Sequence, residues 1–230
     1  MVRFKSIIWG VLLFFGLFIL DGILQSIYLI ATTSKTNMVA AIIITIIMIA
    51  AEIAVLLPIF HYFKSKFDAF DFHKITSVDI LNTAKYVAII MIGNVILTIL
   101  HTLFIGKVTE AANQSSIESM ATPSMIIGLV AMVTLVAPFV EELMFRGIIM
   151  NYFVYGFPKW LKIIISGVAF GLFHVVGEPF QFFALLQYSF MGCVLAYAYT
   201  ANNRLQSSIM VHIGNNLIAS LSLILIAVAK

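Results

Sequence analysis

The sequence predicts an all-α protein, a polytopic bundle of transmembrane helices with about seven spans and a cytoplasmic N-terminus. Hydrophobic residues make up 62% of the chain and charged residues 10%, against about 45–50% and about 25% in an average soluble domain. The apolar residues also occur in long runs that are separated by short polar connections. A single water-soluble core could not use so much apolar surface.

Seven apolar runs are long enough, or nearly long enough, to cross a bilayer as helices. A hydrocarbon core about 30 Å thick requires about 20 apolar residues of helix, because unpaired backbone groups in lipid cost several kcal/mol each. The first run follows a basic N-terminus but is too long for a cleaved signal peptide, so we expect a retained first span. The predicted spans are residues 7–31, 37–63, 84–105, 124–155, 160–176, 180–200 and 206–229.

The positions of Lys and Arg predict the orientation, because basic residues are retained on the cytoplasmic side. With the N-terminus inside, nine basic residues fall in cytoplasmic segments, whereas three fall outside, namely Lys35, Lys107 and Lys230. This excess favours a cytoplasmic N-terminus and an external C-terminus. The nine cytoplasmic residues are Arg3, Lys5, Lys64, Lys66, Lys74, Lys85, Lys159, Lys162 and Arg204.

Two connections are long enough to have features of their own. Residues 64–79 form a mixed-charge cytoplasmic connection that we expect along the membrane surface, and Thr76 and Asp79 have the spacing of a helix cap. Residues 107–123 form the polar outer loop. We therefore divide the chain into residues 1–122, with three spans and this loop, and residues 123–230, the predicted catalytic core.

Composition also excludes several classes of site and partner. Cys193 is the single cysteine, so a disulfide within the chain and cysteine-based metal clusters are excluded. The net charge of +3 is small and the basic residues are dispersed, so nucleic acid is not an expected partner. We expect the chain to be embedded in a lipid bilayer.

Polar residues inside membrane spans are functional hypotheses by default, because a charge at mid-membrane costs about 2.5–3.5 kcal/mol even on the milder scales. The first three spans contain Asp21, Glu52, Asn94 and His101, with no mutual spacing that implies chemistry. We interpret these four mainly as residues that form hydrogen bonds between helices.

The fourth span contains a pair of neighbouring glutamates. Glu142 and Arg146 are four residues apart and share a helix face, whereas Glu141 projects about 100° away from its neighbour. The arginine is therefore expected to hold Glu142 and to leave Glu141 free. Pro138 removes an amide donor and is expected to kink the helix and widen a cavity there. A purely structural ion pair would leave Glu141 without a purpose.

The later spans contain two further polar motifs. His174 follows Phe170 by four residues, and a lone histidine of this kind is more often a hydrogen-bonded core residue than a catalyst. His212 and Asn216 are also four residues apart and share a face, while Gly214 between them leaves room for another helix. Polar groups on three spans of one bundle predict a shared site.

In these motifs the sequence resembles the CPBP family, which holds the type II CAAX prenyl endopeptidases and their bacterial relatives. The family pattern is E-E-x-x-x-R, F-x-x-x-H and H-x-x-x-N or D on successive membrane helices, and every key position is filled here. The resemblance covers roughly residue 123 to the C-terminus. It implies an intramembrane endopeptidase in which Glu141, with His174, activates a water, while His212 and Asn216 stabilise the oxyanion.

The resemblance also implies supporting roles for Phe170 and for Arg146, which would orient Glu142. We expect no cofactor, although zinc held by Glu141, His174 and His212 stays the alternative; these ligands would come from three helices and lack the H-E-x-x-H pattern. The sequence also has no G-x-S-x-G motif of a serine protease and no aspartate pair in its last spans.

The expected substrate is a membrane-associated peptide or protein, prenylated or not, and the expected location is a bacterial cell membrane. Two other functions stay open. One is a non-catalytic partner, such as a bacteriocin-immunity protein that kept the motifs. The other is an ion-coupled transporter with a path through Glu52, His101, Glu141 and His174, which no inverted repeat supports.

The predicted spans place the three motifs at different depths. Glu141 falls near the middle of the bilayer, and His212 falls about 9 Å from the cytoplasmic end at about 1.5 Å per residue. His174 falls closer to the outer end. A shared site therefore requires that the fifth predicted span tilts or begins later than drawn.

Overall fold

The computed structural model describes residues 2–33, 36–106, 111–176 and 181–229, and in that part it contains helices and no strands. This confirms the predicted all-α membrane class. Within these residues, six helical segments are long and apolar enough to cross a membrane: Ile7–Ala31, Met38–Lys64, Ser77–Ile105, Ile126–Phe153, Phe182–Asn202 and Leu205–Ala229.

The helices follow the predicted spans closely, and the helix that corresponds to the fifth span is short. The fifth predicted span corresponds to a helix of 17 residues that is not among the six, so the number of spans stays a prediction. In chain order the elements are α1 (Val2–Thr33), α2 (Met38–Lys64), the 3₁₀ turn η1 (Asp68–Phe70), α3 (Ser77–Ile105), α4 (Ala112–Met120), α5 (Ile126–Ala131), the π-helix η2 (Met132–Val136), α6 (Ala137–Glu142), the π-helix η3 (Leu143–Phe153), α7 (Lys159–Val175), α8 (Phe182–Asn202) and α9 (Leu205–Ala229).

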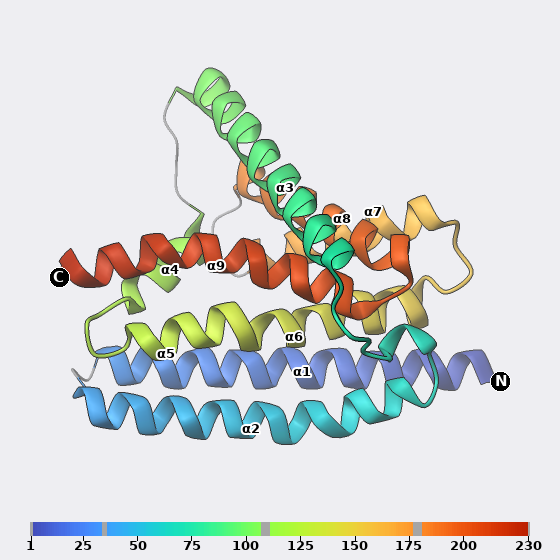
Figure 1. Ribbon diagram of the computed structural model, residues 1–230, viewed down its shortest axis with the longest axis horizontal. Helices are drawn as coiled ribbons and strands as arrows, with labels where there is room; N and C mark the ends of the chain where they lie inside the picture. Colours follow the sequence, from blue (N-terminus) through green and yellow to red (C-terminus); the bar gives the residue numbers. More distant parts are fainter. Residues whose placement is uncertain (1, 34–35, 107–110, 177–180, 230) are drawn as a thin grey trace.

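The long helices run back and forth along one axis. Figure 1 shows α1, α2, the α5–α6 segment and α9 lying alongside one another, while α3 leaves this layer at an angle. The chain ends lie at opposite ends of the bundle. The N-terminal end also holds the end of α2 and the starts of α3, α7 and α9. Helices from the N-terminal and C-terminal halves of the chain therefore pack against one another in a single bundle.

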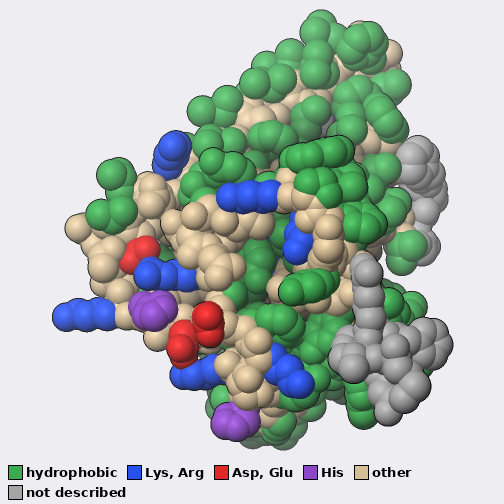
Figure 2. Space-filling model, turned by 90° about the vertical axis from the view of Figure 1, so that its right-hand side faces the viewer, with side chains coloured by type: hydrophobic (Ala, Val, Ile, Leu, Met, Phe, Trp, Pro, Cys, Tyr) green, Lys and Arg blue, Asp and Glu red, His purple; other side chains and the backbone are tan. Residues whose placement is uncertain are grey.

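Basic side chains gather at the N-terminal end of the bundle. Figure 2 views this end and shows Lys and Arg side chains distributed over it together with histidines and acidic residues. Lys66, Lys74, Lys85 and Lys159, all predicted to be cytoplasmic, are exposed there. The distribution agrees with the predicted orientation, which remains a prediction.

Local signals in the sequence account for two helix starts. Asn37 caps α2 by accepting a hydrogen bond from the Ala40 amide. Thr76 and Asp79 form the expected capping box, so the cap is confirmed. Because this cap already begins the helix, α3 starts at Ser77 and not near residue 84, where the apolar run begins.

The predicted outer loop is partly helical. Residues 107–110 lie outside the described residues, but α4 occupies most of the rest of the segment 107–123. Met120 at the end of this short helix is buried in a core cluster with Tyr28 and Met125, and Ile117 packs against that cluster. The loop therefore covers the interior of the bundle at the end opposite to the basic residues.

The fourth span is not a regular α-helix. Its α-helical parts, α5 and α6, are each followed by a π-helical segment, η2 and η3. In η2 the Ala137 amide donates to the Met132 carbonyl, five residues earlier. Pro138 comes next and has no amide hydrogen, so the carbonyl of Val133 lacks the corresponding partner within the helix. The expected irregularity at Pro138 thus takes the form of wider helical turns.

Candidate active site

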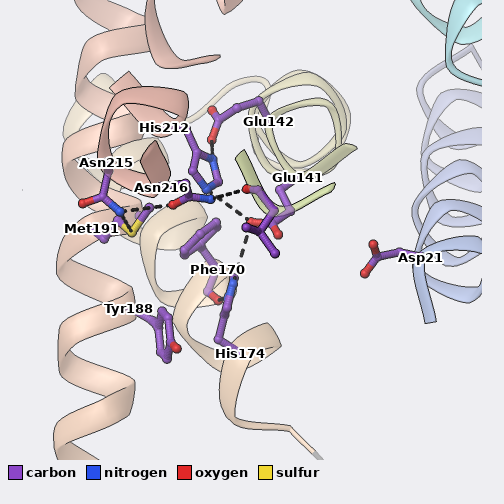
Figure 3. Close-up of polar contacts among 12 residues, drawn as sticks. Asp21, Glu141, Glu142, Phe170, His174, Tyr188, Met191, His212, Asn215 and Asn216 are labelled. Atoms are coloured by element: carbon purple, nitrogen blue, oxygen red, sulfur yellow. Dashed lines mark hydrogen bonds and ion pairs between the residues drawn. The ribbon is translucent and has the colours of Figure 1, made fainter. Parts of the chain in front are cut away.

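The structure brings together one residue from each of the three motifs. Glu141 on α6 points its Oε2 toward the Nε2 atoms of His174 on α7 and His212 on α9, and each of these nitrogens lies 3.7 Å away. Figure 3 shows the two imidazoles converging on this carboxylate. The difference in depth that the straight spans predicted is therefore absent. The wider turns of η3 advance less per residue than α-helical turns, which shortens the distance from the basic end to Glu141.

The neighbouring glutamate is engaged in a different set of contacts. Glu142 Oε1 accepts hydrogen bonds from Arg146 at 2.8 Å and from Nδ1 of His212 at 2.9 Å. The side chains of Glu142 and Arg146 are both 0% exposed. The expected ion pair at a spacing of four residues is therefore present. The bond to His212 was not predicted, and it connects the glutamate pair directly to α9.

Arg146 also joins its own helix to α8. It donates a hydrogen bond to the carbonyl of Gly192, and its guanidinium lies 5.3 Å from the centre of the Phe170 ring. Gly192 packs against α7 so closely that an added Cβ would lie 2.8 Å from the carbonyl oxygen of Gly167. Small residues permit this approach of two membrane helices. As a result, α7, α8 and η3 are held together at the level of the site.

The ring of His174 has a defined orientation. Its Nδ1 lies 2.9 Å from the carbonyl oxygen of Phe170, and because a carbonyl can only accept, Nδ1 carries the hydrogen. The ring lies between Phe170 and Tyr188, with ring centres 4.4 Å apart on each side. Nε2 is therefore the free nitrogen, directed at Glu141. The same reasoning applies to His212, whose Nδ1 donates to Glu142.

Asn216 lies beside the same space but has a partner elsewhere. Its Nδ2 donates to the carbonyl of Val133 at 2.8 Å, and its Oδ1 accepts a hydrogen bond from Asn215 at 3.2 Å. These two bonds fix which way the amide points. A second N–H on Nδ2 is still available for another acceptor.

A cavity of about 460 Å³ adjoins this cluster, and residues of all three motifs line it. Polar residues of the first three helices line the same cavity; Glu52 and His101 were named with Glu141 and His174 as a transporter path, whereas Asp21 and Asn94 were not. Glu52 and Asn94 each have a buried oxygen without a hydrogen-bond partner among the described residues. Asp21 is bonded to Gln25 of its own helix at 2.8 Å. These contacts do not show the expected hydrogen bonds between helices, so that role stays a prediction for Asp21, Glu52 and Asn94.

His101 differs from the other three. Its ring stacks on Phe183 of α8, with the ring centres 4.5 Å apart, and it also lines the cavity. Tyr188 and Gln187, which also lie on α8, complete this wall and had no signal in the sequence. An aromatic or amide residue in an apolar helix can be recognised as part of a cavity wall only when the packing of the neighbouring helices is known.

A metal site is not evident in this arrangement. Among the residues that the structure describes, no group of three or more His, Cys, Asp or Glu side chains is arranged to hold a metal ion. Glu141, His174 and His212, the possible zinc ligands named from the sequence, converge at 3.7 Å without forming such a group. We therefore derive no chemical step through a metal.

Comparison with known proteins identifies the segment that contains these residues. Residues 123–218 match the family described as type II CAAX prenyl endopeptidase Rce1-like. This segment includes all three motifs, and the resemblance noted in the sequence is thereby confirmed. No curated protein and no solved structure gives a significant match to the chain.

Proposed function

We propose, on the premise that segment 123–218 belongs to the type II CAAX prenyl endopeptidase family, that this protein hydrolyses a peptide bond of a membrane-associated peptide or protein. At the family level the assignment supports an intramembrane protease of the CAAX type. The observation that carries the finer proposal is the convergence of His174 and His212 on Glu141, in a cavity surrounded by apolar helices.

Glu141 serves as the general base in this proposal. A separation of 3.7 Å is too long for a hydrogen bond, but a single water beside the three atoms can contact all of them. Such a water donates one hydrogen to Glu141 Oε2 and the other to the free Nε2 of His174. Its lone pair is then directed into the cavity, where the peptide carbonyl lies.

His212 and Asn216 supply positive charge and donors for the oxyanion. This role requires the doubly protonated form of His212, the imidazolium. The imidazolium is held through Nδ1 by Glu142. It then donates from Nε2 to the developing oxyanion, and the second N–H of Asn216 donates beside it.

The proton taken from water completes the reaction. Glu141 receives it when the water attacks, and returns it to the leaving nitrogen when the bond between carbonyl carbon and nitrogen breaks. Glu142 and Arg146 position His212 and do not touch the substrate. Phe170 supports both imidazoles and the guanidinium with its ring.

A transporter is the second candidate, and one observation favours it. Glu52, His101, Glu141 and His174, the path named from the sequence, all line the same cavity. The family match supports the protease instead. A non-catalytic partner protein does not account for two imidazoles directed at one buried carboxylate.

One experiment separates these functions. The full-length protein, purified in detergent, is incubated with a mixed peptide library beside the Glu141→Ala variant, and new termini are detected by mass spectrometry. We expect defined cleavage by the wild type and none by the variant. Absence of cleavage by a folded wild type, or equal cleavage by both proteins, contradicts the proposal.

A further inference from the structure

Three carboxylates, each near the middle of its helical span, line one cavity. The described spans Ile7–Ala31, Met38–Lys64 and Ile126–Phe153 contain Asp21, Glu52 and Glu141, each within two residues of the midpoint of its span. All three residues line the cavity. The helices that carry them run side by side (Figure 1). Mid-membrane charges of one sign are costly, so their gathering requires an explanation.

The cavity contains no cationic side chain to balance them in the part of the chain that is described. None of its described lining residues is Lys or Arg. Arg146 is not among them, and it is used by Glu142 and the Gly192 carbonyl. His174 and His212 direct their Nε2 atoms at Glu141 and not at the other two carboxylates. Asp21 and Glu52, on α1 and α2, are therefore left without a cationic partner among the described residues that line the cavity.

Glu52 has a carboxylate oxygen that is available to accept a hydrogen bond from a ligand. Its side chain lines the cavity and is only 1% exposed, and Oε2 has no hydrogen-bond partner among the described residues. Asp21, on α1, lines the same cavity as Glu52. Gln25 donates to one oxygen of Asp21 and thereby orients it. In Figure 3 the Asp21 carboxylate points toward Glu141.

We infer that Asp21 and Glu52 form a subsite for a Lys or Arg side chain of the substrate, while Glu141 acts on the peptide bond. This inference rests on the proposed peptidase function and names its substrate class: membrane-associated peptides with a basic residue close to the cleaved bond. The charged head would lie between the two carboxylates, where charge-assisted hydrogen bonds are strong.

The surroundings fit a long basic side chain better than an inorganic cation. Leu24, Met48 and Leu129 line the cavity with the acidic pair, and an apolar lining suits the methylene stem of Lys or Arg. A calcium ion takes about six to eight oxygen ligands. No group of three or more acidic or other metal-binding side chains is arranged for a metal in the described chain.

The test uses the full-length protein in detergent and paired peptides. A peptide cleaved in the library is resynthesised with Lys or with Met at each position near the cleaved bond, because Met has similar length and no charge. We expect kcat/KM to be about 30-fold or more higher for Lys at one position, since a buried charge that loses its partner costs at least about 2 kcal/mol. Asp21→Asn and Glu52→Gln keep the shape of each side chain and should lower this Lys-to-Met ratio toward one.

Glu118→Gln is the matched control, because this carboxylate lies on α4 and is not among the described residues that line the cavity. It should retain the full Lys-to-Met ratio. Melting temperatures report whether each variant is folded. The preference of the wild-type protein for Lys over Met tests the inference even if a variant does not fold. If the wild type cleaves peptides without preferring Lys or Arg, or if both variants keep the preference, the inference is wrong although the protein is a peptidase. If no peptide is cleaved, the proposed function itself fails.

Discussion

Asn216 on α9 donates a hydrogen bond of 2.8 Å to the carbonyl of Val133 in η2. This is the carbonyl that Pro138 cannot serve, because the preceding amide, Ala137, already reaches back five residues to Met132. The side chain thus replaces a missing backbone donor inside a membrane span, where an unpaired carbonyl is costly. Asn216 therefore stabilises the widened helix that presents Glu141, in addition to its proposed contact with the oxyanion.

Replacing Asn216 should lower stability in a way that depends on Pro138. Asn216→Ala leaves the Val133 carbonyl without its partner, at a cost of about 1–3 kcal/mol. Pro138→Ala restores an amide at the position that can serve this carbonyl. We expect the double variant to be more stable than Asn216→Ala alone, as measured by melting temperature in one detergent. Additive losses in the double variant would show that the two residues act independently.

The packing of α7 on α8 should not tolerate a methyl group at Gly192. A Cβ there would lie 2.8 Å from the Gly167 carbonyl oxygen, so the helices must separate, and overpacking costs about 1–3 kcal/mol. Because Gly192 also accepts from Arg146, activity should fall as well. Gly16→Ala is the control, since no described atom lies within 4 Å of its added Cβ. Equal melting temperatures for both variants would contradict this account.

The sequence predicts those contacts that depend on spacing within one helix. The Glu142–Arg146 pair follows from a separation of four residues, and the Thr76 cap follows from a local pattern. Long apolar runs likewise predict the membrane helices. In each case the partner is a neighbour in the chain, so the geometry of a single helix is sufficient.

Contacts between residues that are far apart in the chain cannot be predicted from spacing within one helix. Asp21 and Glu52 have no mutual spacing because they lie on separate helices, and only the packed bundle places them in one cavity. The hydrogen bond from Asn216 to the Val133 carbonyl in η2 joins residues that are 83 positions apart in the chain. His174 and Glu141 likewise lie on separate helices, so straight spans drawn from the sequence placed them at different depths although they meet in the structure.

The orientation in the membrane can be tested directly. Reporter fusions at Lys66, in the connection after α2, and at Ser116, in α4, should report opposite compartments, with Lys66 cytoplasmic. The reason is the excess of basic residues at the end of the bundle that contains Lys66 (Figure 2). The measurement is the ratio of two reporters that are active on opposite sides. Finding both sites in one compartment would overturn the topology.

Activity should survive removal of divalent metals. The structure directs Glu141 and the two imidazoles at a common space, but no metal-binding group of three is present among the described residues. We therefore expect an unchanged cleavage rate after dialysis against a strong chelator, with metal content measured by mass spectrometry. Loss of activity that zinc restores would instead make Glu141, His174 and His212 the ligands of a catalytic ion.

The two adjacent glutamates should fail in different ways when each is changed to glutamine. Glu141→Gln removes the base but keeps its shape, so turnover should fall by about 10²–10⁴ or more with little change in melting temperature. Glu142→Gln leaves Arg146 buried without a counter-charge, which costs about 3–5 kcal/mol, and it also weakens the hold on His212. Its main symptom should be lost stability. Changing Arg146→Met as well removes the unpaired charge and should recover part of that stability, although activity need not return. An unstable but active Glu141→Gln beside a stable but inactive Glu142→Gln would show that the base and the positioning residue are reversed.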